Sequence, residues 1–307
     1  MPQIIGFGAL NVDNILKVEN LNLSENPAYP ADIQAGGNAA NTIAALAKLG
    51  VSCGFVGVVA NDAFGKLILS EFRRRKVDTS QIVIRKQPNL QATSGIVETY
   101  VDKKGRRSLF VKPGVNSSLA FKEINIDYLA NAKFVHVTSY VDDKQFEIQK
   151  QVLKKLHNSV KVSFAPGSLY VSRSLREMES IISRTYVLFI EKKEAFYLTK
   201  KNYKEAATSV LKMGPKIVVI TLGKDGCYVA SDQSSFIKKP PKVNVIDTTG
   251  AGDAFAAGFL LGLVENYNLE KCSQLGNAVA SFTIRRIGAR AGLPNRKELS
   301  TIVSLTK

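Results

Sequence analysis

The 307-residue sequence is poor in the residues that build covalent cross-links and metal sites. It has no tryptophan, two histidines and three cysteines. Cys53, Cys227 and Cys272 are odd in number and far apart, which argues against a disulfide framework and against a Cys-x-x-Cys zinc site. His136 and His157 are too few for a His-based zinc site. We therefore expect three buried thiols and, because His136 lies in an apolar run, a core histidine.

Long hydrophobic runs are also missing. The longest nearly apolar run, residues 254–264, contains two glycines and is about half as long as a segment that spans a bilayer. The chain runs from Met1 directly into an apolar segment, without the basic region and the cleavage site of a signal peptide. These features predict a cytoplasmic protein that neither spans nor binds a membrane.

Acidic residues are few relative to basic ones. The sequence has 42 Lys and Arg but 26 Asp and Glu, so the formal net charge is +16. An excess of this size is typical of nucleic-acid-binding proteins. Here, however, the basic residues are spread along the whole chain, without a basic arm or an interleaved aromatic platform. The sequence therefore favours a small anionic ligand such as a nucleotide over a nucleic acid.

The chain alternates short β-branched runs with longer segments of helical period, the pattern of βαβ units around a parallel sheet. Average hydrophobic and charged contents, 45% and 22%, exclude wholesale disorder. This pattern predicts an α/β fold of three layers. The strands are expected at residues 3–9, 52–59, 134–138, 161–164, 187–190, 216–221, 226–230 and 235–237, and the helices at 39–49, 62–76, 144–157, 203–213, 252–265 and 269–286.

Two regions, at about residues 11–35 and 93–112, do not follow the alternation of strands and helices. In both, polar residues alternate with apolar ones. Within the second, residues 96–101 and 108–111 flank the turn Asp102-Lys103-Lys104-Gly105 and predict a hairpin. We expect both regions to form a small sheet that serves as a lid on a single domain of residues 1–307. Its exposed edges make it the expected interface of a homodimer.

The most informative stretch is Asp247-Thr248-Thr249-Gly250-Ala251-Gly252-Asp253, which follows a predicted strand at 242–246 and opens a helix. Glycines in such a turn let backbone N–H groups converge at a helix N-terminus, which favours an anion. A carboxylate beside a phosphate cradle is a poor phosphate ligand but a good acceptor for the proton of an attacking hydroxyl. The stretch therefore predicts phosphoryl transfer with Asp253 as the base.

Other phosphate-binding motifs are absent. The sequence has no GxxxxGK[ST] loop and no HRD or DFG set, and Gly6-Phe7-Gly8-Ala9-Leu10-Asn11 breaks the GxGxxG pattern at its last glycine. These absences disfavour a P-loop enzyme, a protein kinase and an ordinary dinucleotide dehydrogenase.

A second group of polar residues lies near the N-terminus. Asn11 and Asp13 follow the first predicted strand, and Gly36-Gly37-Asn38-Ala39-Ala40-Asn41 opens a helix. Carboxylate and amide groups at such ends can hold several vicinal hydroxyls, and paired glycines let a ligand approach the backbone. A sugar or another polyol fits this pattern best.

These two motifs resemble the two signatures of the PfkB, or ribokinase-like, carbohydrate kinases, and the order of elements between them resembles that family over essentially the whole chain. The resemblance implies a Rossmann-like αβα sandwich with a mostly parallel central sheet and a β-sheet lid, ATP as donor and Mg²⁺ as partner. It also implies roles for individual residues: Asp253 as catalytic base, Gly250, Ala251 and Gly252 as anion hole, and Asn11, Asp13, Gly37, Asn38 and Asn41 around the sugar.

The resemblance extends to a second set of positions that would serve the nucleotide and the ions. Those at the nucleotide are Thr221, Gly223, Gly226 and Asn277; Glu194 matches a glutamate that organises Mg²⁺ and phosphate through water; and Asp247 and Thr249 match a monovalent-cation site that takes K⁺.

The sequence also departs from the family pattern. Glu191 stands where the family has asparagine, and Ala165 where many relatives have aspartate. Asn38 replaces a common lysine, and Thr138-Ser139-Tyr140 lacks the glutamate that ribokinases place on the sugar. An extra carboxylate near a triphosphate repels it unless Mg²⁺ or Lys192 offsets the charge. The nucleotide geometry and the sugar are therefore both open.

Several functions fit these residues. The first is ATP-dependent phosphorylation of a pentose or hexose hydroxyl. A nucleoside kinase would need aromatic lid residues to stack the base, for which Tyr100 and Phe110 are candidates. A sugar-phosphate kinase would bind the second phosphate through Arg106, Arg107 or Lys112. A non-catalytic nucleotide or sugar sensor is the alternative outside enzymes, although a sensor has no need of a base at Asp253.

Overall fold

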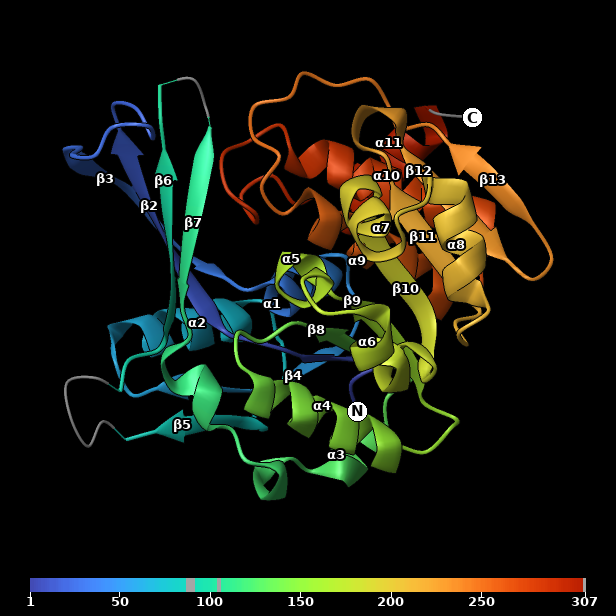
Figure 1. The fold of residues 1–307 in the computed structure, drawn as a ribbon, viewed down its shortest axis with the longest axis horizontal. Helices are drawn as coiled ribbons and strands as arrows, with labels where there is room; N and C mark the ends of the chain where they lie inside the picture. The colour runs from blue at the N-terminus through green and yellow to red at the C-terminus, as the bar shows by residue number, and fades with distance from the viewer. Residues whose placement is uncertain (87–91, 104–105, 306–307) are drawn as a thin grey trace.

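The computed structural model describes residues 1–86, 92–103 and 106–305, which form two β-sheets and the helices around them (Figure 1). The larger sheet has the strand order β13-β12-β11-β10-β9-β8-β1-β4-β5. All its neighbours pair in parallel except β11 with β12 and β12 with β13. Its strands are β1 (Ile4–Phe7), β4 (Cys53–Ala60), β5 (Ile82–Arg85), β8 (Phe134–Thr138), β9 (Lys161–Ala165), β10 (Thr185–Glu191), β11 (Ile217–Thr221), β12 (Cys227–Ser231) and β13 (Ser235–Lys238).

Helices cover both faces of this sheet, as the three-layer prediction requires. Successive side chains of a strand point to opposite faces, so Ile4 joins one buried cluster and Ile5 the other. The cluster with Ile4 packs against α1 (Asn38–Lys48), α2 (Ala63–Arg74), α9 (Ala251–Val264), α10 (Leu269–Thr283) and α11 (Arg296–Leu305). The cluster with Ile5 packs against α3 (Ile126–Ala130), α4 (Asp143–Lys155), α5 (Gly167–Val171), α6 (Leu175–Ile182), α7 (Lys192–Thr199) and α8 (Tyr203–Leu211).

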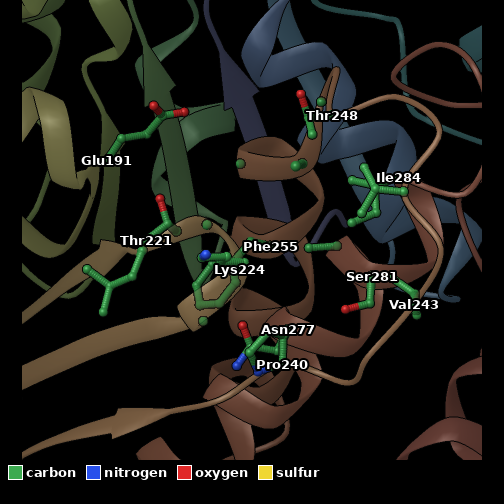
Figure 2. A pocket seen from close by; sticks show the side chains of 18 of the residues that line it. Glu191, Thr221, Lys224, Pro240, Val243, Thr248, Phe255, Asn277, Ser281 and Ile284 are labelled. Atoms are coloured by element: carbon green, nitrogen blue, oxygen red, sulfur yellow. The ribbon is translucent and has the colours of Figure 1, made fainter.

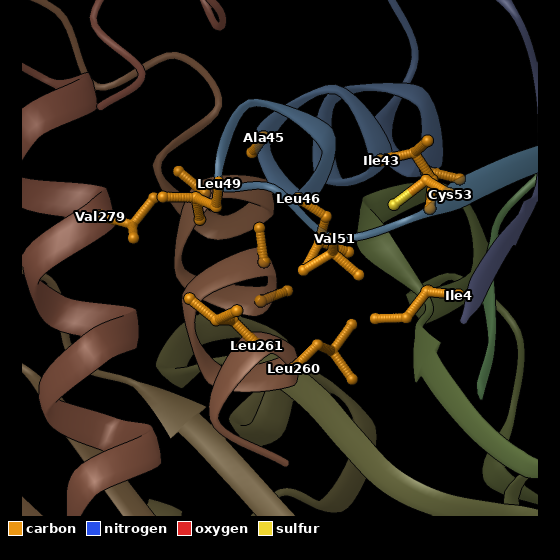
Figure 3. Packing of buried hydrophobic residues seen from close by; sticks show 14 of the residues in the cluster. Ile4, Ile43, Ala45, Leu46, Leu49, Val51, Cys53, Leu260, Leu261 and Val279 are labelled. Carbon is orange, nitrogen blue, oxygen red and sulfur yellow. The ribbon is translucent and has the colours of Figure 1, made fainter. Parts of the chain in front are cut away.

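Helices α1 and α9, which are far apart in the sequence, pack against each other. Leu46 of α1 and Leu260 of α9 lie in the same buried cluster as Ile4 of β1 (Figure 3). Burying a leucine side chain contributes about 2 kcal/mol, so this apolar cluster helps to hold the two helices against each other. Both helices carry residues that the sequence places in the site.

The smaller sheet has the order β3-β2-β6-β7 and projects away from the larger one (Figure 1). β2 (Asn11–Val18) pairs antiparallel with β3 (Ala28–Gly36) and in parallel with β6 (Gly95–Val101), which pairs antiparallel with β7 (Arg107–Lys112). The two aberrant regions of the sequence therefore form the expected small sheet. The β6–β7 hairpin is confirmed, while Lys104 and Gly105 of its turn lie outside the described residues.

Several elements differ from the prediction. The helices α3, α5, α6, α7 and α11 were not anticipated. Residues 242–246 form no strand but an irregular segment, because Pro240 and Pro241 precede them and lack the N–H groups that a sheet ladder needs. β5, which the sequence analysis did not anticipate, forms the edge of the large sheet beside β4.

The expected core residues are confirmed. Cys53, Cys227 and Cys272 are free and buried. His136 is fully buried, its Nδ1 lies 2.8 Å from the hydroxyl of Ser163, and burial lowers its pKa to about 3. It is therefore a neutral core histidine. Within the part of the chain that the structure describes, no helix is both long and apolar enough to cross a membrane.

Candidate active site

Asp253 lies in the first turn of α9. Gly250 caps this helix in the left-handed region, with φ of 72°, where a side chain would also meet Ala289. The Thr42 hydroxyl of α1 donates to the backbone carbonyl of Asp253 over 3.3 Å. A helix N-terminus is a site of positive potential, so the turn places the Asp253 carboxylate beside an anion-binding position.

The side chain of Asn41, on α1, holds the carboxylate of Asp253. Its Nδ2 donates to Oδ2 of Asp253 over 2.9 Å. Loss of solvent around the carboxyl group raises the pKa of Asp253 to about 7, against the lowering influence of Asn41 and Arg290. A carboxylate with a pKa near neutrality is suited to accept a proton at neutral pH.

Asp13, on β2, is the second carboxylate of this region. It lies against Gly36, where an added Cβ would be 2.5 Å from both carboxylate oxygens. Gly37 has φ of 96°, and its own Cβ would be 2.4 Å from the carbonyl oxygen of Ala9. Burial raises the pKa of Asp13 to about 6 although Arg290 lowers it. The glycine pair thus lets β3 and α1 approach a carboxylate that a side chain would displace.

Asn11 is buried beside Asp13 at the start of β2. Its Oδ1 accepts from Nδ2 of Asn116 over 3.0 Å. Asn116 also bonds both backbone groups of Leu10, which fixes the point where β1 leads into β2. The Asn116 contacts therefore leave the amide donors of Asn11 as the groups that can serve a ligand.

Residues 250–252 offer backbone donors on the other side of Asp253. The N–H of Ala251 donates to the carbonyl of Thr248 over 3.2 Å. The N–H groups of Gly250 and Gly252 have no hydrogen-bond partner among the described residues. An added Cβ on Gly252 would meet no heavy atom within 4 Å, so the space in front of this residue is open to a ligand.

A cleft of about 1050 Å³ runs from Asp253 between α9, α10 and β11. Figure 2 shows Glu191 and Thr221 on one side of it and Val243, Ser281 and Ile284 on the other. The predicted nucleotide residues Thr221, Gly223, Gly226 and Asn277 all line this cleft, as do Asn38, Gly250, Ala251 and Gly252. The lining combines apolar side chains, among them Val243, Val245 and Phe255, with Lys192, Lys193, Lys224 and Lys242, which matches a molecule with a flat base and a charged tail.

Comparisons with known proteins agree with this geometry. A family model described as pfkB family carbohydrate kinase matches residues 1–296. The chain belongs to the pfkB family of carbohydrate kinases. It is thus a phosphotransferase that acts on a hydroxyl group.

Named relatives of this kinase span nearly its whole length. A protein of Archaeoglobus fulgidus named as an uncharacterized sugar kinase is 35% identical, covering 81% of this chain and 98% of its own. An ATP-dependent ribose-1-phosphate kinase of Halopiger xanaduensis is 29% identical over 95% of both chains. The crystal structure of a ribokinase from Thermotoga maritima superposes with a TM-score of 0.87 at 24% identity, covering 99% of this chain and all of that one, and shows the shared fold.

Glu194, which the resemblance places near Mg²⁺, caps α7 of this carbohydrate kinase. Its Oε2 accepts from the backbone N–H of Glu191 over 2.8 Å, and it does not line the cleft itself. Burial and the neighbouring Glu191 raise the pKa of Glu194 to about 7 although the Glu191 N–H lowers it. Glu191, the departure from the family pattern, is exposed and lines the cleft beside Lys192 and Lys193.

The structure brings Asp247 and Thr249 together but fills the position expected for K⁺. Oδ1 of Asp247 accepts from the N–H and the hydroxyl of Thr249 over 2.8 and 2.7 Å, and Oδ2 accepts from the N–H of Gly288 over 2.8 Å. Arg107, from β7 of the small sheet, donates to Oδ1 and also to the Thr249 hydroxyl. Because a guanidinium already supplies the positive charge, this group does not fit a monovalent cation.

The observed contacts of two basic residues were not anticipated, although Arg107 was considered for a second phosphate. Arg290 lies behind Asp13 and Asp253 and bonds Asn41, and Arg107 reaches Asp247 from the small sheet. Neither belongs to a motif, and both contacts join residues at least 140 positions apart. In the sequence, Arg290 had no sign beyond the excess of basic residues, whereas Arg107 was considered for a second phosphate rather than for Asp247.

Proposed function

We propose that this carbohydrate kinase transfers the γ-phosphoryl group of ATP to a primary hydroxyl of a small sugar, with Asp253 as the base. The observation that carries the proposal is the position of Asp253. It lines the cleft that fits a nucleotide, and its side chain is bonded to Asn41 of the polar group that fits a sugar. One carboxylate thus faces both partners of a phosphoryl transfer.

The residues divide the reaction among them. Asp13 and Asn41 orient the sugar so that one hydroxyl lies against Asp253. That hydroxyl loses its proton to Asp253 as its oxygen bonds to the γ-phosphorus, and the bond between this phosphorus and the β,γ-bridging oxygen breaks. The N–H groups of Gly250 and Gly252 face the charge on the transferring group, and one aligned donor of this kind contributes about 3 kcal/mol. Positioning and electrostatics account for most of such a rate enhancement.

Mg²⁺ would be held where Glu191 lines the cleft. Magnesium in kinases is held by one or two carboxylates together with substrate phosphates. Glu191 lines the cleft, and Glu194 lies beside it with its carboxylate bonded to the Glu191 N–H. No group of three or more His, Cys, Asp or Glu placed to hold a metal occurs in residues 1–86, 92–103 and 106–305. In this proposal the nucleotide phosphates would supply further oxygen ligands. The ion would neutralise phosphate charge, including the repulsion from Glu191.

We also propose that residues 1–307 act as one cytoplasmic catalytic unit with the small sheet as its lid. A lid excludes water, which would otherwise compete with the sugar for the phosphoryl group. The small sheet exposes several large apolar side chains, namely Tyr29, Ile33, Leu109 and Phe110. Pairing of two chains through this sheet would cover them, and light scattering on purified protein tests that pairing.

Among the acceptors, a neutral sugar accords best with the contacts of the small sheet. The basic residues considered for a second phosphate are all engaged: Arg106 with Asp102, Arg107 with Asp247 and Lys112 with Glu98. Tyr100 and Phe110, considered for stacking a nucleoside base, pack edge to face on each other at 5.7 Å between ring centres. These contacts leave the amides and carboxylates near Asp253 as the recognition groups.

A panel of acceptors tests the proposal. Purified enzyme with ATP and Mg²⁺ is offered ribose, fructose, a keto-deoxy sugar acid, ribose 1-phosphate and adenosine, and ADP formation is measured. We expect turnover with at least one free sugar, and none when Asp253 is replaced by asparagine. Turnover with ribose 1-phosphate or adenosine alone would overturn the neutral-sugar assignment. Tight binding of sugar and ATP without any turnover would instead indicate a sensor.

A further inference from the structure

We propose that Arg290 is a positioning residue for the catalytic base: it orients the Asn41 amide so that Oδ2 of Asp253 accepts a hydrogen bond and Oδ1 receives the proton of the acceptor hydroxyl. The inference rests on the proposed role of Asp253. It assigns a task to a buried arginine outside both sequence motifs, and it names the oxygen that acts.

The direction of the hydrogen bonds carries the argument. Nε of Arg290 lies 2.8 Å from Oδ1 of Asn41, and Nδ2 of Asn41 lies 2.9 Å from Oδ2 of Asp253. A guanidinium has donors only, so the atom of Asn41 that faces it must be the oxygen. The amide nitrogen then has to face Asp253, and Oδ2 of Asp253 has to accept. Only Oδ1 is left to take a proton.

Without Arg290 this order is not fixed. The two ends of an asparagine amide have nearly the same shape, so a free Asn41 could turn its oxygen toward Asp253. Two acceptor oxygens would then face each other unless Asp253 carried a proton on Oδ2. In that state Asp253 is neutral and cannot act as a base. The donor-only side chain of Arg290 therefore selects the competent arrangement.

Arg290 itself is held firmly. It is 7% exposed, its Nη2 donates to the carbonyl of Gly36 over 3.3 Å, and its guanidinium lies 5.9 Å from the centre of the Phe72 ring. The chain is fixed on either side of it, because the Gly288 N–H bonds Asp247 and the Leu293 carbonyl accepts from Lys48. A side chain fixed in this way can orient its neighbour without moving during the reaction.

The charge of Arg290 is not neutralised by a direct ion pair within the described residues, and its Nη1 has no hydrogen-bond partner there. Burial, with Arg75 nearby, lowers the pKa of Arg290 to about 10, so it stays charged at neutral pH. Asp13, Glu71 and Asp253 favour that charge from a distance. Its field therefore acts on the carboxylates of the site.

The charged groups around Asp253 come from three other parts of the chain. Arg290 favours the ionised form, whereas Asp13 of β2 and Glu191 at the end of β10 oppose it. Asn41 of α1 is neutral and donates its hydrogen bond to the carboxylate. Arg290 is thus the cation that offsets burial and two like charges. Its removal should raise the pKa of Asp253 further.

Two substitutions of Arg290 separate orientation and charge from simple filling of space. Arg290→Lys keeps a charge and a donor, whereas Arg290→Met keeps neither. The measurement is kcat/KM for the active sugar against pH at saturating ATP, which reports the pKa of the base in the enzyme–ATP complex before the sugar binds. We expect the acidic limb of Arg290→Lys to stay near that of the unchanged enzyme. For Arg290→Met we expect the limb to move up by roughly one pH unit and the plateau to fall at least about tenfold.

The proposal would be overturned if both variants lost the same fraction of the kcat/KM plateau and the acidic limb of the pH profile did not move. An arginine with a merely structural role gives that result. If Arg290→Met does not fold, Asn41→Asp takes its place and leaves Arg290 intact. This change puts an acceptor-only group between the two side chains, so one of the paired carboxyls must keep a proton, and the limb should move up by more than one unit. An unmoved limb and unchanged plateau in Asn41→Asp would also overturn the proposal.

The unchanged enzyme and Asp253→Asn show which idea has failed. If Asp253→Asn keeps its turnover, the proposed function itself is wrong. If Asp253→Asn is inactive and the acidic limb of the pH profile is the same in the unchanged enzyme and in the Arg290 and Asn41 variants, only the positioning role is wrong. Difference infrared spectra of the protonated carboxyl, identified by its loss in Asp253→Asn, give a second measure of the same pKa without turnover.

Discussion

Arg107 of the small sheet forms an ion pair with Asp247, 140 residues farther along the chain, with 2.5 Å between Nη2 and Oδ1. Asp247 begins the stretch that leads into α9 and Asp253, so this pair links the small sheet directly to the catalytic helix. The Asp247 side chain is 5% exposed and that of Arg107 31%. The pair is therefore partly shielded from solvent, and its hydrogen bonds are charge-assisted.

Arg107→Ala should weaken closure of the small sheet over the sugar. We expect KM for the sugar to rise about threefold to tenfold with little change in the midpoint of thermal unfolding, because a partly exposed ion pair contributes only about 1 kcal/mol. Steady-state kinetics and thermal denaturation measure the two effects. The control is Arg106→Ala, since Arg106 pairs with Asp102 inside the small sheet. Equal KM changes in both variants would show that the link to Asp247 is unimportant.

The same substitution should expose Asp247 to cations. In the unchanged enzyme we expect the rate to be the same in KCl and in choline chloride of equal concentration, because Arg107 supplies the charge at Asp247. In Arg107→Ala we expect K⁺ to restore part of the lost activity. Strong stimulation of the unchanged enzyme by K⁺ would contradict this explanation of the Asp247 group.

Asp253→Asn should abolish chemistry and spare nucleotide binding. Asparagine preserves the shape and can still accept the hydrogen bond from Asn41, but it cannot take a proton. We expect kcat to fall roughly 10³-fold or more, while the dissociation constant for ATP changes less than about threefold. Single-turnover kinetics and calorimetric titration measure these quantities. Near-normal turnover of Asp253→Asn would show that Asp253 is not the base.

The same variant should be more stable than the unchanged protein at pH 8. The pKa of Asp253 rises from 3.8 to about 7 on folding, so between about pH 4 and pH 7 the folded chain binds more protons than the unfolded chain. The free energy of unfolding then falls as the pH rises through this window. Thermal unfolding should show Asp253→Asn melting a few degrees higher at pH 8 and not at pH 4. A lower melting temperature at pH 8 would show that the protein favours the ionised carboxylate.

Gly252→Ala should separate stability from activity. The added methyl group meets no protein atom within 4 Å, and alanine in a helix is about 1 kcal/mol better than glycine. The methyl group nevertheless enters the space in front of the N–H groups, so we expect equal or higher stability with at least tenfold lower kcat/KM for ATP. Gly258→Ala in the same helix is the control. Its Cβ would be 2.5 Å from the Leu275 carbonyl, so it should lower stability instead.

Residues close in sequence carried most of what could be predicted. The alternation of Ile4 and Ile5 between two cores and the period-two pattern of β2 and β6 follow from local periodicity. The turn before Asp253 combines glycines, a helix start and a carboxylate within seven residues. Such patterns fix which elements form. The expectation that Asn41 and Asp253 share one site needed two separate motifs and a resemblance to a known family, and their direct hydrogen bond was not predicted.

The parts that escaped prediction depend on long-range contacts. Arg290 looks like an ordinary surface charge in the sequence, and only the fold shows that it is buried beside Asn41. Arg107 was considered for a second phosphate, and only the fold shows its contact with Asp247. Asn116 is a loop asparagine until β1 and β2 bring Leu10 and Asn11 to it. The strand expected at residues 242–246 does not form. Its alternation of apolar residues suggested a strand, but the two prolines in front of it cannot donate hydrogen bonds to a sheet ladder.

The position of Arg290, beyond α10, has a consequence for shortened forms of this chain. A form cut before residue 290 still holds both sequence signatures. It lacks the guanidinium that bonds Asn41, so under the proposed mechanism the Asn41 amide has no fixed orientation toward Asp253. The two signatures together would then be insufficient for phosphoryl transfer.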